Sequence, residues 1–206
     1  MPRAAPPADV DLAQPLIEAL AGPGWGVWPG AIPLEYCRQL ELRARARDRD
    51  GDFKLGAVGA GRGRVVRSDI RGDRICWVNE STGIEAALLL VFDALREALN
   101  RELQLGIAQF ECHYSIYPLG AVYQRHRDRS PRGSERVVSL VLYLNAAWRP
   151  SDGGALRLYL ETGPVDVSPA AGTLVAFLSE RFDHEVRPAS RERLSLSGWF
   201  RRRATL

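Results

Sequence analysis

The sequence contains few cysteines and no long apolar run. The three cysteines are too few and too widely spaced for a disulfide framework or a zinc cage; they are Cys37, Cys76 and Cys112. The longest clean apolar run, residues 86–92, is far shorter than the roughly 20 residues that a membrane helix needs. The first residues also lack the apolar core of a secretory signal peptide. We therefore expect a reduced, cytoplasmic protein.

Lysine is nearly absent, because Lys54 is the only lysine among the 28 basic residues and all the others are arginine. A GC-rich gene explains this bias more simply than an arginine-lined nucleic-acid surface does. The 25 acidic residues leave a net charge of only +3. The densest arginine runs, 43–49 and 201–203, are interrupted by an acid or lie at the chain end. We expect solvated arginine faces and neither a nucleic-acid nor a membrane partner.

The length and composition are those of one globular domain. The 206 residues are 46% hydrophobic and 26% charged, which allows a sizeable core without disulfide or metal staples. Residues 1–8 are rich in proline and alanine, so we expect a disordered tail there and a single domain over residues 9–206. No apolar stripe is left unexplained, and we expect a monomer.

Helical periodicity is confined to the first half of the chain. Apolar residues at helical spacing predict helices over 11–21, from residue 33 onward, and over 84–99. The last of these stripes is continuous and predicts a face laid against a sheet. Residues 56–72 are rich in glycine but lack the lysine and serine of a phosphate-binding loop. They predict a mobile surface loop between two strands.

After residue 105 the apolar pattern switches to the alternation that is typical of strands. Turn signals separate eight predicted strands, at 107–117, 122–126, 137–144, 155–160, 165–167, 173–177, 184–186 and 193–200. A short strand at 25–28 precedes them. Strands that follow helices in this way predict an α+β fold: a jelly-roll core of about eight strands, with the N-terminal helices packed on one sheet.

Two of the three histidines stand where they could share a metal ion. His126 and Asp128 are two residues apart at the end of a predicted strand, so their side chains project to the same side. His184 opens a later strand that can lie beside the first. Two imidazoles and one carboxylate form the facial triad of non-haem Fe(II) oxygenases, with positions left open for a chelating cosubstrate and O₂. Taken alone, the pattern is more simply explained by a surface aspartate and two ordinary histidines.

Arg193 strengthens the metal hypothesis. In the strand 193–200, Arg193 shares one face with Ser197 and Trp199, and leucines occupy the other face. If the leucines pack against the helices, the guanidinium points into the barrel, where it requires an anionic partner. A dicarboxylic cosubstrate would chelate iron at one end and pair with Arg193 at the other. The Tyr143 hydroxyl could donate a hydrogen bond to the same carboxylate.

With these residues the sequence resembles the 2-oxoglutarate- and Fe(II)-dependent dioxygenases. It is most similar to the prolyl 4-hydroxylases related to the hypoxia-inducible-factor prolyl hydroxylases and to their bacterial relatives. The similarity runs from about residue 70 to 200, and more weakly back to about residue 10. The matching segments are Ile70-Arg-Gly-Asp-Arg-Ile-Cys-Trp77, Tyr117-Pro118, Tyr123-x-x-His126-x-Asp128, Tyr143-Leu-Asn-x-x-Trp148, Gly153-Gly-x-Leu-Arg157 and His184-Glu-Val186.

The resemblance implies a double-stranded β-helix with the metal near one open end. Three residues match the Fe(II) ligands of the family: His126, Asp128 and His184. Four match its 2-oxoglutarate pocket: Arg193, Tyr143, Tyr117 and Ser197. The implied reaction couples oxidative decarboxylation of 2-oxoglutarate, to succinate and CO₂, with O₂-dependent hydroxylation of a proline. Stimulation by ascorbate is compatible with this chemistry.

The resemblance also implies a protein substrate that carries the target proline, and a translation elongation factor such as EF-Tu is a candidate. Four residues match positions at the substrate channel: Asp73, Trp77, Arg136 and Trp199. The segment 56–72 matches a loop that closes over the peptide, and we expect Asp73 to pair with Arg136 on closure. Core packing is the alternative for both tryptophans. The turn 117–123 is one residue shorter than in the animal enzymes, which leaves the ligands intact and the nearby substrate contacts open.

Two other functions stay open on the sequence alone. The same chemistry could act on a different residue, a small molecule or a nucleobase, although the glycine-rich loop favours a peptide. A non-catalytic binding module would lack a ligand or the arginine, and neither is missing. His113 matches no functional position and is expected, like the three cysteines, to have a packing role.

Overall fold

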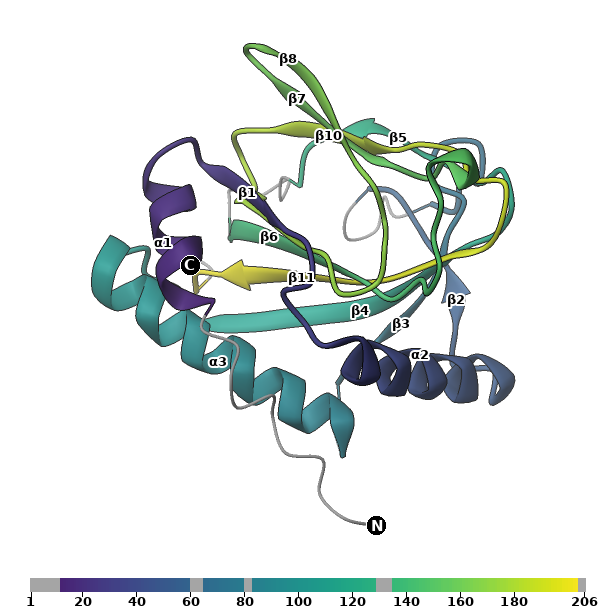
Figure 1. The fold of residues 1–206 in the computed structure, drawn as a ribbon, viewed down its shortest axis with the longest axis horizontal. Coiled ribbons are helices and arrows are strands. Elements are labelled where there is room, and N and C mark those ends of the chain that lie inside the picture. The colour runs from purple at the N-terminus through teal and green to yellow at the C-terminus, as the bar shows by residue number, and fades with distance from the viewer. Residues whose placement is uncertain (1–11, 60–64, 80–82, 129–134, 204–206) are drawn as a thin grey trace.

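The computed structural model describes residues 12–59, 65–79, 83–128 and 135–203. Two antiparallel sheets face each other, and three helices cover the outer face of the larger sheet (Figure 1). This is the predicted α+β architecture with a jelly-roll core. The expected disordered tail, residues 1–8, lies outside the described residues. None of the described helices is long and apolar enough to cross a membrane.

The helices form where apolar residues recur at helical spacing. Their bounds are Ala13–Ala21 (α1), Leu34–Arg49 (α2) and Ile84–Leu103 (α3). Pro33 directly precedes α2, where its fixed φ and missing N–H suit a helix start. The side chain of Asn100, in the last turn of α3, forms hydrogen bonds with both the N–H and the C=O of Ile107, which lies beyond the helix; both distances are 2.7 Å. This pair of bonds fixes the path of the chain from α3 into the next strand.

The larger sheet has seven strands in the order β1-β9-β6-β11-β4-β3-β2. These are Trp25–Trp28 (β1), Lys54–Leu55 (β2), Arg74–Trp77 (β3), Gln109–Tyr117 (β4), Arg136–Tyr143 (β6), Leu174–Leu178 (β9) and Arg193–Arg201 (β11). The smaller sheet has the order β5-β10-β7-β8. These are Tyr123–His126 (β5), Leu156–Leu160 (β7), Gly163–Val167 (β8) and Asp183–Val186 (β10).

All eight strands predicted after residue 105 are present, each with its ends within two residues of the expected positions. The predicted first strand is β1, which pairs with β9 at the edge of the larger sheet. The short strands β2 and β3 pair with each other, and β3 also pairs with β4. They flank the glycine-rich segment, so its described part lies between two strands, as predicted.

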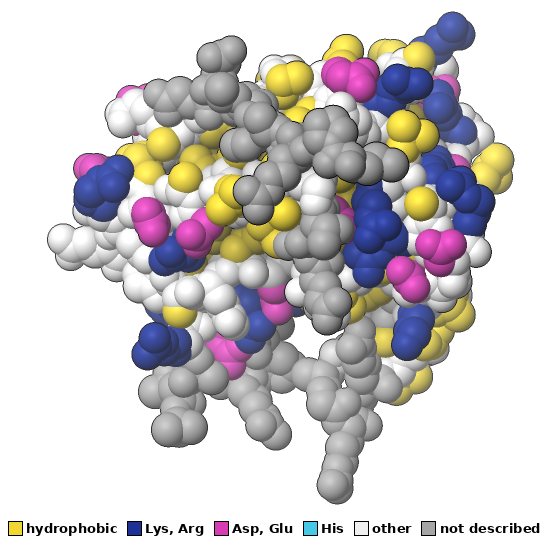
Figure 2. Space-filling view, turned by 90° about the horizontal axis from the view of Figure 1, so that it is seen from below, with side chains coloured by type: hydrophobic (Ala, Val, Ile, Leu, Met, Phe, Trp, Pro, Cys, Tyr) yellow, Lys and Arg dark blue, Asp and Glu magenta, His cyan; other side chains and the backbone are white. Residues whose placement is uncertain are grey.

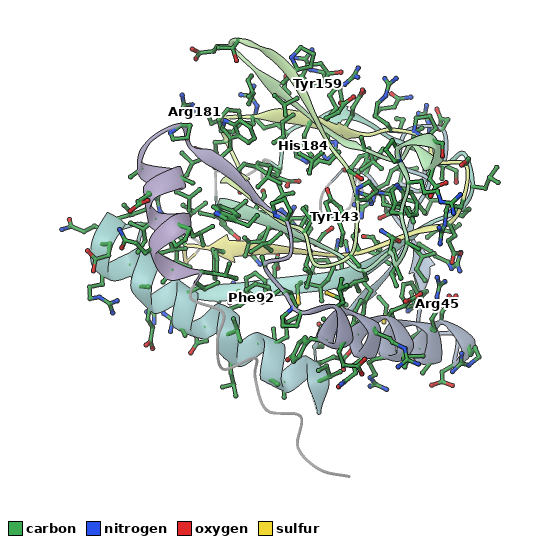
Figure 3. All side chains as sticks on the ribbon, viewed as in Figure 1. Arg45, Phe92, Tyr143, Tyr159, Arg181 and His184 are labelled. Atoms are coloured by element: carbon green, nitrogen blue, oxygen red, sulfur yellow. The ribbon has the colours of Figure 1, made fainter. Side chains whose placement is uncertain are left out.

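Strand β11 separates the core from the interior of the barrel. Leu194, Leu196 and Phe200 join the large apolar cluster that includes the helices. The side chains of Arg193 and Trp199 line a cavity between the sheets instead. The predicted alternation is therefore confirmed. In Figure 3, Phe92 of α3 lies on the helix side of β11, whereas Tyr143 and His184 lie on the other side.

A row of three phenylalanines joins α3 to the larger sheet. The ring centroids of Phe92 and Phe110 are 4.6 Å apart, and those of Phe110 and Phe200 are 5.0 Å apart. Gly198 makes room for the middle ring, because a Cβ at this position would lie 2.4 Å from Phe110 Cζ. The missing side chain of Gly198 thus lets the aromatic ring of Phe110 on the neighbouring strand approach the backbone of β11 closely.

Two arginines of α2 have a buried partner rather than a purely solvated setting. Arg43 and Arg47 both contact the buried carboxylate of Glu85, at 3.2 Å, and Arg47 also bonds the backbone oxygen of Trp77. The Arg47 side chain is only 15% exposed, which corrects the expectation of a solvated face at this position. Seen from below, the described surface mixes arginine and acidic side chains with small apolar areas (Figure 2).

Truncating Phe92 should remove the first ring of the aromatic row. We expect Phe92→Ala to lower the free energy of unfolding by about 3–5 kcal/mol, because it leaves a cavity in a fully buried site. Leu90→Ala is the matched control on the same helix, since Leu90 is 63% exposed, and it should change stability by no more than about 0.5 kcal/mol. Urea unfolding followed by circular dichroism measures both, and equal effects would contradict the assigned core.

Candidate metal centre

A cavity of about 540 Å³ lies between the two sheets. Its wall includes residues from both sheets and from the segment between β2 and β3. The charged and imidazole side chains among its lining residues are Arg71, His113, Arg125, His126, Arg127, Asp128, Arg136, His184 and Arg193. The cavity thus contains every metal-ligand candidate that the sequence predicted.

His126, Asp128 and His184 converge at one end of this cavity. The pairing of β5 with β10 places His126 directly opposite His184, and Asp128 follows two residues after β5 ends. His126 Nε2 lies 3.8 Å from Asp128 Oδ1, and His184 Nε2 lies 3.6 Å from Asp128 Oδ2. One ligand atom from each residue falls within 4.8 Å of the others. The set has the composition and the spacing of a facial triad, and it fits Fe(II).

Both imidazoles present the nitrogen that a metal needs. His126 Nδ1 is 2.8 Å from the backbone oxygen of Gln124, and His184 Nδ1 is 3.4 Å from that of Phe182. A carbonyl can only accept, so Nδ1 carries the proton in each ring and the Nε2 lone pair is free. Burial, followed by repulsion from His184, lowers the pKa of His126 to about 3. Its imidazole is therefore neutral near pH 7, as ligation requires.

The carboxylate of Asp128 is ionised and tightly held. Burial alone would raise its pKa, but His184, His126 and Arg136, together with a hydrogen bond from Trp199, bring the pKa well below its usual value. Oδ2 accepts hydrogen bonds from Trp199 Nε1 and from Ser139 Oγ, each at 2.8 Å. Ser139 was not predicted, and Trp199 was predicted only as part of the substrate channel.

Arg193 is buried deeper in the same cavity and is 2% exposed. Its Nε donates to the backbone oxygen of Gly154 at 3.0 Å, and its Nη1 donates to Ser195 Oγ at 3.3 Å. No carboxylate among the described residues pairs with it. A buried guanidinium in this state favours an anionic ligand.

The surroundings of Arg193 also fit a carboxylate. The rings of Tyr117 and Tyr143 lie 5.1 Å and 5.0 Å from its guanidinium carbon. The Tyr143 hydroxyl is buried without a hydrogen-bond partner among the described residues, and burial raises its pKa to about 12 against the opposing charge of Arg193. It is therefore a protonated donor close to the cation. Ser197 lines the cavity on the same face of β11. These residues fit a 2-oxoglutarate whose far carboxylate meets Arg193.

The four predicted channel residues all lie near the cavity, but Asp73 and Arg136 have other partners. Asp73 is fully buried and accepts two bonds from Arg71, at 2.6 Å and 3.0 Å. Arg136 contacts Glu111 at 3.1 Å and lies 3.7 Å above the ring of Trp199. Pairing of Asp73 with Arg136 stays a prediction for the closed, substrate-bound state.

Trp77, Trp199 and His113 form an aromatic wall on the cavity side of the larger sheet. The His113 ring is 4.9 Å from Trp77 and 5.3 Å from Trp199. Burial and the charge of Arg71 lower the pKa of His113 to about 4, so its ring is neutral. His113 was expected to have only a packing role, yet it lines the cavity. Its position on the same strand face as Ser115 and Tyr117 was the signal that could have shown this.

The glycine-rich segment contacts the cavity at both of its ends. Residues 57–59 and Ile70 line it, whereas residues 60–64 lie outside the described residues. Gly56 sits directly against the Arg71–Asp73 ion pair, and a Cβ there would lie 2.2 Å from Asp73 Oδ1. Arg71 in turn lies 4.8 Å from the ring of Tyr123, which stacks on His126 at 3.6 Å. This connection between the segment and a metal-ligand candidate was not predicted.

Comparison with known proteins agrees with this geometry. Residues 112–201 match the model of the 2OG-Fe(II) oxygenase superfamily. A solved Pseudomonas putida prolyl-4-hydroxylase is 43% identical and superimposes with a TM-score of 0.84, over 92% of this chain and 98% of that one. A Trichoplax adhaerens prolyl hydroxylase, solved with a peptide fragment of the hypoxia-inducible factor oxygen degradation domain, is 27% identical with a TM-score of 0.81, over 90% and 87% of the two chains.

A curated relative shows the same similarity over a shorter span. The hypoxia-inducible factor prolyl hydroxylase of Caenorhabditis elegans is 34% identical over 144 residues, which are 64% of this chain. The chain spans about a fifth of the length of that relative, because the match covers 20% of it.

Removal of one imidazole should abolish metal binding without unfolding the protein. We expect His126→Ala to show no saturable binding of Fe(II) or Mn(II) in anaerobic calorimetry, because two ligands cannot hold the ion at this site. His113→Gln changes a second cavity histidine outside the triad and should retain binding. If His126→Ala binds the metal with unchanged affinity, the assigned centre is wrong.

Proposed function

This chain belongs to the 2OG-Fe(II) oxygenase superfamily, and we propose that it acts as a protein prolyl 4-hydroxylase. The observation that carries the proposal is a single cavity that contains both the His-Asp-His triad and the buried Arg193, which has no carboxylate partner among the described residues. The 43% identity to the Pseudomonas putida prolyl-4-hydroxylase, over nearly the whole of both chains, directs it towards proline. The proposed catalytic unit is one domain, residues 9–206, that acts as a monomer.

The protein's own part in this reaction is to position the reactants. His126, Asp128 and His184 would hold Fe(II) through three atoms on one side. When bound, the metal and 2-oxoglutarate would supply the oxidation, in which 2-oxoglutarate, O₂ and a substrate C–H group yield succinate, CO₂ and the hydroxylated substrate. Every other contribution comes from the walls of the cavity.

Four residues would orient the cosubstrate. Arg193 would pair with its far carboxylate, and Tyr143 would donate its unpartnered hydroxyl to the same group. Tyr117 and Ser197 would line this pocket. The desolvated position of Arg193 strengthens the ion pair, because little water competes for the guanidinium.

The aromatic wall supports a prolyl substrate. Trp77 and Trp199 give an apolar surface suited to a pyrrolidine ring. Two ion pairs lie next to this surface, one between Arg136 and Glu111 and the other between Asp73 and Arg71. The Trichoplax adhaerens relative was solved with a peptide, and this favours a segment of a protein as the substrate here. A translation elongation factor such as EF-Tu is our candidate for that protein.

Loss of the Arg193 charge should weaken 2-oxoglutarate binding more than it slows turnover. We expect Arg193→Gln to raise the KM for 2-oxoglutarate by about 10- to 100-fold, the effect of losing a buried charge-assisted pair. Arg157→Gln removes an exposed arginine that pairs with Asp166 on the smaller sheet, and it should leave this KM unchanged. Succinate release at varied 2-oxoglutarate measures both, and an unchanged KM in Arg193→Gln would contradict the assigned pocket.

Mass spectrometry of cellular proteins tests the substrate. Proteins from cells that express the wild type or His126→Ala are compared for a gain of one oxygen atom on proline, about 16 Da. We expect a small number of prolyl sites, with EF-Tu examined first, to be modified only by the wild type. A gain on another residue, or on free metabolites alone, would overturn the prolyl assignment and leave the oxygenase chemistry standing.

A further inference from the structure

The two oxygens of Asp128 have unequal surroundings. Oδ2 accepts two hydrogen bonds, from Trp199 Nε1 and Ser139 Oγ, both at 2.8 Å. Oδ1 accepts no hydrogen bond from the described residues. The polar neighbours of Oδ1 are His126 Nε2 at 3.8 Å and Arg136 Nη1 at 3.9 Å, and His184 Nε2 lies 3.6 Å from Oδ2. One oxygen is therefore occupied by protein donors, and the other is left open to the cavity.

The sheet itself sets up the two donors. Ser139 and Trp199 are direct partners across β6 and β11, so their side chains leave the same face side by side. Ser139 Oγ also lies 2.9 Å from Ser179 Oγ, and both serines are buried. Since the Ser139 proton goes to the carboxylate, the Ser179 hydroxyl donates to Ser139. The hydrogen bonds therefore run in one direction, from Ser179 to Ser139 and from Ser139 to the carboxylate of Asp128.

We infer that Ser139 and Trp199 are positioning residues that hold Asp128 as a one-oxygen metal ligand. The inference rests on the proposed metal centre. With the lone pairs of Oδ2 engaged, only Oδ1 is available to the metal. A carboxylate that chelated through both oxygens would occupy a position that a chelating cosubstrate or O₂ requires. The clamp, meaning Ser139 and Trp199 together, keeps that position open.

Trp199 also belongs to the wall that would face the substrate. Arg136 lies 3.7 Å above its ring, and the ring lines the cavity. Phenylalanine at this position could still support the guanidinium but could not donate to Asp128. Trp199→Phe therefore removes the proposed hydrogen bond while keeping the aromatic surface.

Metal titration of the full chain tests the clamp without turnover. Apo protein is titrated with Co(II) in anaerobic calorimetry, and Fe(II) with 2-oxoglutarate is then followed by the visible charge-transfer band of the chelate. We expect Trp199→Phe and Ser139→Val to weaken Co(II) binding by about 10- to 100-fold, the usual effect of losing a hydrogen bond to a metal ligand. Both should also show a weaker chelate band. Ser139→Thr has the shape of the valine variant but keeps the hydroxyl, so it should bind Co(II) nearly as wild type does.

Two matched substitutions separate the clamp from general damage to the cavity. Trp77→Phe removes an indole N–H and Ser115→Ala removes a hydroxyl from the same wall, at residues that do not contact Asp128. Both should leave the Co(II) affinity unchanged. Wild-type affinity in Trp199→Phe, or equal affinity in Ser139→Val and Ser139→Thr, would overturn the inference. If Ser139→Val fails to fold by circular dichroism, Trp199→Phe decides.

The wild type distinguishes this inference from the function on which it rests. If the wild type binds no Co(II), the metal centre and the clamp both fail. If the wild type binds Co(II) and His126→Ala does not, the metal centre is supported, and the Ser139 and Trp199 variants then test the clamp alone.

Discussion

The metal centre depends on the antiparallel register between β5 and β10. His126 and His184 are 58 positions apart in the chain but are direct partners in this pair. Side chains alternate along a strand, so a shift of one residue would turn His184 away from the cavity and bring Asp183 or Glu185 inward. The pairing of β10 with β7 on its other side, where His184 lies opposite Leu158, helps to prevent such a shift. The convergence of the proposed ligands is thus a consequence of strand pairing across β5, β10 and β7.

Strand β11 likewise positions the residues of the proposed cosubstrate pocket. Its leucines are held in the core beneath the helices, and this fixes Arg193 on the opposite side of the strand. A buried guanidinium is unfavourable by itself, but the leucine face leaves it no other orientation. The apolar contacts of the helices therefore maintain a charge in the barrel at a position that suits an anion. In this fold, one face of β11 packs in the apolar core and the opposite face lines the proposed ligand pocket.

The sequence predicted what depends on local pattern. Alternation along β11 placed Arg193 and Trp199 on the cavity face. The spacing of His126 and Asp128 was weak by itself, and it predicted a metal site only together with Arg193 and the family resemblance. The sequence could not predict contacts that depend on which strands are neighbours. Ser139 reaches Asp128 only because β6 pairs with β11 in a particular register, and this register is a property of the whole sheet.

Two ion-pair partners were also missed. Arg47 was expected on a solvated face, but its partner Glu85 comes from another helix and is 1% exposed. Asp73 was matched with Arg136 across the entrance, yet in this structure it is paired with Arg71, two residues before it in the chain. A carboxylate has several guanidiniums within reach in a chain so rich in arginine. Burial and strand register select among them, and neither is written in local periodicity.

The buried polar groups of the cavity give a further reason to expect an anionic ligand. Arg193 without a carboxylate and the Tyr143 hydroxyl without a partner each destabilise the folded chain when the site lacks an anion. A ligand that satisfies both binds only the folded state, so its binding energy adds directly to the stability of the fold. Water can form hydrogen bonds with both groups, but it brings no negative charge to the guanidinium. The fold is therefore less stable without an anion in this cavity, and the proposed dicarboxylate, with one end at the triad and the other at Arg193, would supply that anion.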